Sequence, residues 1–207
     1  MRRFFSIITL MLMALMSNIA INAQNNATTA RAILDKTSKI IGRKGGISAS
    51  FSLSHPKMGN VSGSIAVKGN KFNARTPQAI VWYNGKTQWT YMKKNNEVNV
   101  STPTAAQQQL FNPYTFIHIY KKGYNLSVKT SGQEHNVHLV AQNRSKSIPE
   151  MYITINKRTN VPSRIKMKQK GLWYDIRISK FSATFQPDKA FTFNAKEFPT
   201  AEVIDLR

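Results

Sequence analysis

The hydrophobic and polar residues of this chain alternate in two different periods. Residues 30–41 carry apolar side chains at spacings of three and four, the period of an amphipathic helix. Thr28 or Thr29 can cap the start of this helix, and Gly42 can end it in the left-handed conformation. After Gly45 and Gly46 the period changes to two, which predicts half-buried strands. We therefore expect one helix that lies on a sheet.

The predicted strands follow one another closely along the chain. Strands separated by such short connections pair antiparallel, as in a meander or a barrel. The turn signals between them are Gly69-Asn70, Asn84-Gly85, Asn95-Asn96, Gly123, Ser131-Gly132, Thr159-Asn160 and Gly171.

The sharpest of these signals is Asn84-Gly85, which favours a type I′ turn with a two-residue loop. In that register Tyr83 faces Lys86. One face of the hairpin is the more apolar, and we expect it to point inward. This face carries Ile80, Trp82, Trp89 and Tyr91.

Alternation is clearest near the C-terminus, where Ile165 and Met167 occupy one side of a predicted strand. The other side carries only cations, whose mutual repulsion an acidic partner would relieve. These residues, Arg164, Lys166, Lys168 and Lys170, are therefore predicted to form a basic face that meets such a partner.

The stretch from Pro103 to Lys122 interrupts the strand pattern. It contains an apolar helical segment, and Asn112-Pro113 is a typical start for a second one. The stretch is too apolar for an ordinary surface loop. We expect it to cover the open side of the sheet.

The first residues have the features of a secretory signal peptide, with Arg2 and Arg3 before a short apolar run. We expect cleavage after Ala23, with Ala20 as the alternative site. Residues 24–207 then form one mature domain. The chain has no Cys, which excludes disulfides and a thiol-linked lipid anchor.

The composition is strongly basic, with 30 Lys and Arg against 9 Asp and Glu and a net charge of +21. Removing Arg2 and Arg3 from this total leaves +19. Such an excess favours association with anionic surfaces. The export signal argues against nucleic acid as the partner.

No set of residues indicates catalysis, because the acids are few and scattered and no Cys nucleophile exists. His135 and His138 are three apart in a predicted strand, so their side chains point to opposite faces and do not predict a metal site. We expect a binding protein without a cofactor and not an enzyme.

Several motifs, read together and in order, resemble the LolA-like periplasmic lipoprotein carriers along nearly the whole mature chain. They are Ala32-Ile33-Leu34-Asp35-Lys36, Ser48-Ala49-Ser50-Phe51, Gly63-Ser64-Ile65-Ala66-Val67-Lys68 with Phe72, Asn84-Gly85-Lys86-Thr87-Gln88-Trp89-Thr90-Tyr91, Asn112-Pro113 and Lys189-Ala190-Phe191-Thr192-Phe193.

The resemblance implies a mainly β fold, an unclosed and curved antiparallel half-barrel with an N-terminal helix and a helical lid over a hydrophobic cavity. It implies a periplasmic chaperone that takes acylated lipoproteins from an inner-membrane exporter to an outer-membrane receptor. We expect a monomer. The candidate cavity residues are Phe51, Ile65, Val67, Ile80, Trp82, Trp89, Tyr91, Leu110, Phe116, Ile117, Ile153 and Ile155.

One departure from the family pattern concerns the lid. In the best-known relatives an arginine follows the lysine of the second strand and holds the lid closed, whereas here Lys68 is followed by Gly69 and Asn70. The lid is therefore expected to be held differently or to stand partly open. Two alternative functions stay open on the same fold: a carrier of free lipid or glycolipid, and a non-catalytic periplasmic sensor or interaction domain.

Overall fold

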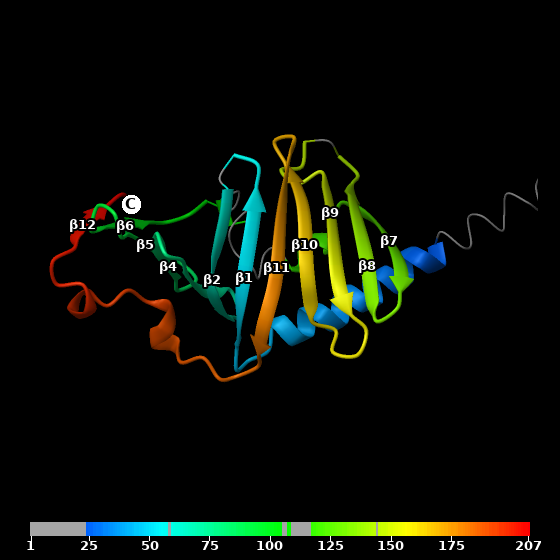
Figure 1. Ribbon diagram of the computed structural model, residues 1–207, viewed down its shortest axis with the longest axis horizontal. Coiled ribbons are helices and arrows are strands. Elements are labelled where there is room, and N and C mark those ends of the chain that lie inside the picture. Colours follow the sequence, from blue (N-terminus) through cyan, green and yellow to red (C-terminus); the bar gives the residue numbers. More distant parts are fainter. Residues whose placement is uncertain (1–23, 58, 105–106, 109–116, 144) are drawn as a thin grey trace, which may run out of the picture.

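One long helix and one large sheet make up most of the computed structural model, which describes residues 24–57, 59–104, 107–108, 117–143 and 145–207 (Figure 1). The helix covers residues 24–41. The strands are β1 (Ile47–His55), β2 (Gly59–Lys68), β3 (Lys71–Arg75), β4 (Ala79–Tyr83), β5 (Gln88–Met92), β6 (Glu97–Ser101), β7 (Tyr124–Ser131), β8 (Glu134–Ala141), β9 (Glu150–Asn156), β10 (Pro162–Gln169), β11 (Leu172–Ser182) and β12 (Glu202–Asp205). Short 3-10 helices are η1 (Ile119–Lys121), η2 (Asp188–Phe191) and η3 (Ala195–Glu197).

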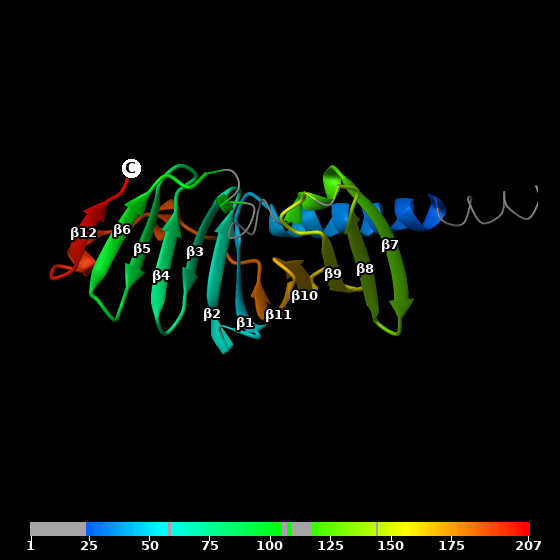
Figure 2. The ribbon, with the colours of Figure 1, turned by 90° about the horizontal axis from the view of Figure 1, so that it is seen from above.

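The strands form a single sheet in the order β12-β6-β5-β4-β3-β2-β1-β11-β10-β9-β8-β7. Neighbours pair antiparallel, except that β12 runs parallel to β6. Because β12 and β7 do not pair with each other, the sheet is open, and Figure 2 shows how strongly it curves between its two ends. The predicted mainly β, unclosed and curved antiparallel sheet is confirmed.

The N-terminal helix (residues 24–41) lies across β7 to β10 (Figures 1 and 2). Its buried residues Ala30, Ile33 and Leu34 pack with apolar side chains of those strands, as the three-four spacing predicts. The predicted start was wrong, because the chain is already helical at residue 24. The hydroxyls of Thr28 and Thr29 do not cap the helix; they donate to the carbonyls one turn earlier.

Two turns differ from the prediction. Residues 84–87 connect β4 and β5 as a four-residue loop, in which the Asn84 side chain accepts hydrogen bonds from the backbone of Lys86 and Thr87. The Asn84 side chain thereby stabilises the loop, and Asn84 itself needs no positive φ. In the observed register Trp82 pairs with Trp89, whereas the prediction paired it with Thr87. A two-residue turn with both φ positive occurs instead at Lys170-Gly171, between β10 and β11.

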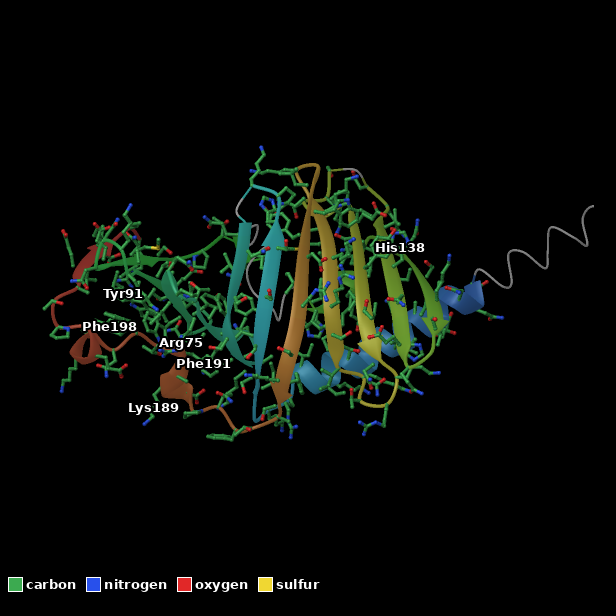
Figure 3. All side chains as sticks on the ribbon, viewed as in Figure 1. Arg75, Tyr91, His138, Lys189, Phe191 and Phe198 are labelled. Atoms are coloured by element: carbon green, nitrogen blue, oxygen red, sulfur yellow. The ribbon has the colours of Figure 1, made fainter. Side chains whose placement is uncertain are left out.

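The C-terminal segment after β11 covers one face of β3 to β6. Trp82 meets Phe193 and Phe198 edge to face, each at a ring-centroid distance of 5.5 Å. The ring centroid of Tyr91 in β5 lies 4.7 Å from that of Phe198, and Figure 3 shows these two residues side by side. Phe191 of η2 is fully buried. This aromatic cluster is core, built from strands and from a segment about 100 residues further along the chain.

We predict that Trp82→Ala lowers the free energy of unfolding by about 3–5 kcal/mol, because the change leaves a cavity between the sheet and the C-terminal segment. Phe185→Ala is the matched control, since Phe185 is 67% exposed, and it should change stability by less than about 0.5 kcal/mol. Urea unfolding of both variants measures the difference. Equal stability of the two would show that the cluster is not core.

Candidate functional site

The concave face of the sheet contains a pocket between the end of the N-terminal helix and the first two strands. The pocket encloses about 550 Å³ of non-atom space, part of it open to solvent. The lining is apolar apart from one serine and consists of Ile41, Ile47, Ala49, Ser50, Phe51, Ile65, Val67, Ile117, Pro162, Ile165, Ile178 and Phe181.

Strand alternation and the end of the helix together position this lining. Alternate residues of β1 and β2 point to the concave face, which places Ala49 opposite Ile65 and Ile47 opposite Val67. The helix ends at Ile41, because the chain must turn over residues 42–46 to begin β1. The concave face of β1 and β2 therefore lies beyond the helix, and a hollow remains there.

Four of the predicted cavity residues line this pocket: Phe51, Ile65, Val67 and Ile117. Ile153 and Ile155 do not; they are buried beneath the N-terminal helix and belong to its core. Leu110 and Phe116 lie outside the described residues. Ile41, the last helical residue, also lines the pocket and was not predicted to do so. Its position in the apolar stripe, next to the predicted end of the helix, was a signal that could have identified it.

The remaining four predicted residues, Ile80, Trp82, Trp89 and Tyr91, are on the opposite face, and their assignment to the cavity is corrected. Tyr83 packs with Val67 and Ile117 on the pocket side, so the adjacent Trp82 points away from the pocket. The two hairpin faces were separated correctly, but the more apolar one was taken as the cavity wall. It is apolar because Phe193 and Phe198 cover it.

Ile117 lies over the pocket, and Tyr120, three residues later, hydrogen-bonds the N-terminal helix and so holds this segment in place. The Tyr120 hydroxyl donates to Asp35 of the N-terminal helix at 2.5 Å, and Tyr120 itself is 1% exposed. Burial and the bond to Asp35 raise the pKa of Tyr120 to about 12. The phenol is therefore protonated at physiological pH. This contact joins residues 117–121 to the N-terminal helix.

The predicted basic face is not a row of unrelieved cations. Arg164 Nε donates to Asp175 Oδ1 at 2.7 Å, and its Nη2 bonds the second carboxylate oxygen. Lys166 and Lys168 place Nζ 5.6 Å and 5.8 Å from the Trp173 ring centroid. Lys170 has a φ of 47° in the turn after β10 and leaves the strand. The repulsion argument therefore fails on this face.

The two histidines considered as metal ligands have separate surroundings. His135 Nδ1 lies 2.8 Å from the Thr130 hydroxyl, whereas His138 Nε2 lies 3.0 Å from Glu150 and its ring stacks on Tyr152. Within the described residues, no group of three or more His, Cys, Asp or Glu side chains is arranged to hold a metal ion. In the same part of the chain, no helix is long and apolar enough to cross a membrane.

Comparison with solved structures finds a protein that shares the fold. An uncharacterized conserved protein from Thermus thermophilus is similar with a TM-score of 0.59 at 15% identity, covering 86% of this chain and 99% of that one. A LolA superfamily protein from Nitrosomonas europaea has a TM-score of 0.45 at 14% identity, covering 79% and 97%. A search of the curated proteins gives no match.

Comparison with family models assigns the chain directly. The model described as outer membrane lipoprotein carrier protein LolA matches residues 19–171. The matched range includes the N-terminal helix and the pocket residues from Ile41 to Ile165. The chain therefore belongs to the LolA outer membrane lipoprotein carrier family.

Proposed function

We propose that this protein is a periplasmic carrier that shelters lipoprotein acyl chains in the pocket of β1 and β2 and delivers them toward the outer membrane. The observation that carries the proposal is the lining, which is apolar at every position but Ser50. Each methylene moved from water into such a lining gains about 0.8 kcal/mol. Acyl chains are thus held without directional polar contacts, and the protein acts as a binding protein and not as an enzyme.

The mode of binding also suits release. An open, loosely shaped apolar hollow binds through area and not through fixed hydrogen bonds, so a receptor with a tighter site can take the cargo. Because Ile117 is attached to the N-terminal helix through Tyr120 and Asp35, breaking that one hydrogen bond would release this wall of the pocket. Loading and unloading then need no change in the sheet.

Mass spectrometry of material extracted from protein purified from the periplasm tests the cargo. A lipoprotein carrier releases acylated peptide, a carrier of free lipid releases lipid without peptide, and a sensor releases neither. We expect acylated peptide. The same measurement gives the mass of the mature chain, which should begin at Gln24.

We predict that Ala49→Phe weakens binding of a fluorescent fatty-acyl probe at least tenfold, because the added ring fills the pocket beside Ile65. Ser52→Phe adds the same ring to the same strand on the exposed opposite face and should leave the affinity unchanged. Probe titration of both variants, with thermal melts to check folding, makes the comparison. Equal affinities would rule this pocket out as the acyl site.

Tyr120→Phe should cost about 1 kcal/mol of stability at pH 7 through the lost hydrogen bond to Asp35. It should also weaken probe binding, because Ile117 loses its attachment. Tyr124→Phe is the control: its hydroxyl bonds the Ile148 carbonyl and holds no pocket wall, so it should leave probe affinity unchanged.

The same variants predict an effect at alkaline pH. The pKa of Tyr120 and of Tyr124 is raised to about 12, by burial in each case and also by Asp35 for Tyr120. Since the folded state holds these protons more tightly than the unfolded state, stability should fall as the pH rises from about 10 to about 12. Urea unfolding across this range should show a smaller fall in either Phe variant. An unchanged fall would contradict the assignment.

A further inference from the structure

One exposed aromatic side chain stands among cations beyond the strand ends next to the pocket. Phe185 is 67% exposed and lies in the segment between β11 and η2. Lys68 Nζ is 4.9 Å from its ring centroid. Because this contact fixes the ring from one side, Phe185 is a positioned side chain whose other side faces water.

Backbone contacts bring a second pair of cations to the same place. Gln186 N donates to Gly45 O at 2.8 Å, so the segment that carries Phe185 is bonded to the turn that carries Arg43 and Lys44. Both of these side chains are exposed. Lys71 and Lys189 complete the group, and Figure 3 shows Lys189 on η2 at the lower edge of the molecule. We name this group of Arg43, Lys44, Lys68, Lys71, Phe185 and Lys189 the Phe185 edge.

Negative charge at the Phe185 edge comes from one residue. Asp188 lies 3.2 Å from Lys68 Nζ and 3.0 Å from Lys71 Nζ, which lower its pKa by hydrogen bonding and by their charge. One carboxylate thus serves two lysines. Among the ion pairs of the described residues, none involves Arg43, Lys44 or Lys189. The edge therefore keeps an unneutralised positive charge around an exposed aromatic ring.

The Phe185 edge also adjoins the pocket. Ile41 and Ile47, which flank the turn of Arg43 and Lys44, both line it. Phe181, four residues before Phe185, lines it too. A surface that contacts the Phe185 edge thus meets the end of the pocket at which the helix stops.

We propose that the Phe185 edge docks this protein on an anionic lipid bilayer, with Phe185 entering the headgroup region and the cations meeting lipid phosphates. A single ring surrounded by basic side chains fits a membrane interface, where apolar anchors and cations act together. A stable protein interface would need an apolar core of several side chains over about 800 Å² on each partner. Docking in this orientation brings the pocket to the lipid surface from which acyl chains enter or to which they leave.

Cosedimentation with vesicles tests the proposal. The full mature protein should bind vesicles of phosphatidylcholine with phosphatidylglycerol and should not bind vesicles of phosphatidylcholine alone. Phe185→Ser should weaken binding on the order of tenfold, because a buried phenyl group is lost. Arg43→Gln with Lys44→Gln should weaken it roughly 25-fold, since each cation near an anionic surface contributes about fivefold.

The matched control is Lys94→Gln with Lys129→Gln. Both lysines are exposed and lie far along the chain from Phe185, and this variant loses the same two positive charges as the Arg43 and Lys44 variant. This control should bind within about twofold of the unaltered protein. If it loses as much binding as the Arg43 and Lys44 variant, general charge and not the Phe185 edge attracts the bilayer. Unchanged binding of Phe185→Ser, or equal binding to both vesicle types, would also overturn the proposal.

Docking and acyl binding are separable in this design. Titration with the soluble fatty-acyl probe in the absence of vesicles measures the pocket alone, and Phe185→Ser should keep full probe affinity. Failure of probe binding in the unaltered protein would contradict the proposed carrier function without touching the docking proposal. Failure of vesicle binding with normal probe affinity would contradict docking alone.

Discussion

The two faces of a single sheet both need cover, and this constraint organises the whole molecule. Neighbouring residues of a strand point to opposite faces, so Tyr83 and Trp82 are buried on different sides of β4, at 2% and 3% exposure. The chain meets the requirement with two separate pieces. The N-terminal helix covers one face over β7 to β10, and the C-terminal segment covers the other face over β3 to β6.

The pocket follows from where these covers end. β1 and β2 lie in the middle of the sheet, beyond the helix on the concave side and before the C-terminal segment reaches the other side. Their outward positions are largely serine and tolerate water, whereas their inward positions are apolar and do not. Ile117 reaches across from the insertion and lines the pocket, and the space it leaves is suited to a flexible apolar ligand.

Local features of this fold could be predicted from the sequence, and the features set by distant residues could not. Alternation identified the strands of β1, β2 and β10, and the three-four spacing identified the buried side of the helix, because each pattern is decided within a few residues. The hairpin at Asn84 was mispaired by two residues, which preserved the side-chain faces. A shift by one residue would have exchanged them.

The inward face of that hairpin required non-local information. Ile80, Trp82, Trp89 and Tyr91 form an apolar set whether they line a cavity or pack beneath another segment, and nothing in residues 79–92 distinguishes these cases. The decision lies in Phe193 and Phe198, about 100 residues later. Likewise, the lysines of β10 looked unrelieved until pairing with β11 brought Asp175 to Arg164 and Trp173 to Lys166.

The positions of the acidic residues, and not the total charge, determine where in the molecule positive charge is left without a nearby carboxylate. Four of the nine acidic residues, Glu97, Glu197, Glu202 and Asp205, lie on or just before the paired strands β6 and β12 at one end of the sheet. Asp35 accepts from Tyr120, Glu150 from Tyr152, and Asp175 from Arg164. Glu134, the first residue of β8, accepts from Ser163. The ninth acidic residue is Asp188, beside Lys68 and Lys71. Since exposed charges act within about 8 Å in physiological salt, carboxylates at the far end of the sheet cannot offset the cations near the pocket. Asp188 is therefore the carboxylate that offsets the cations near the pocket.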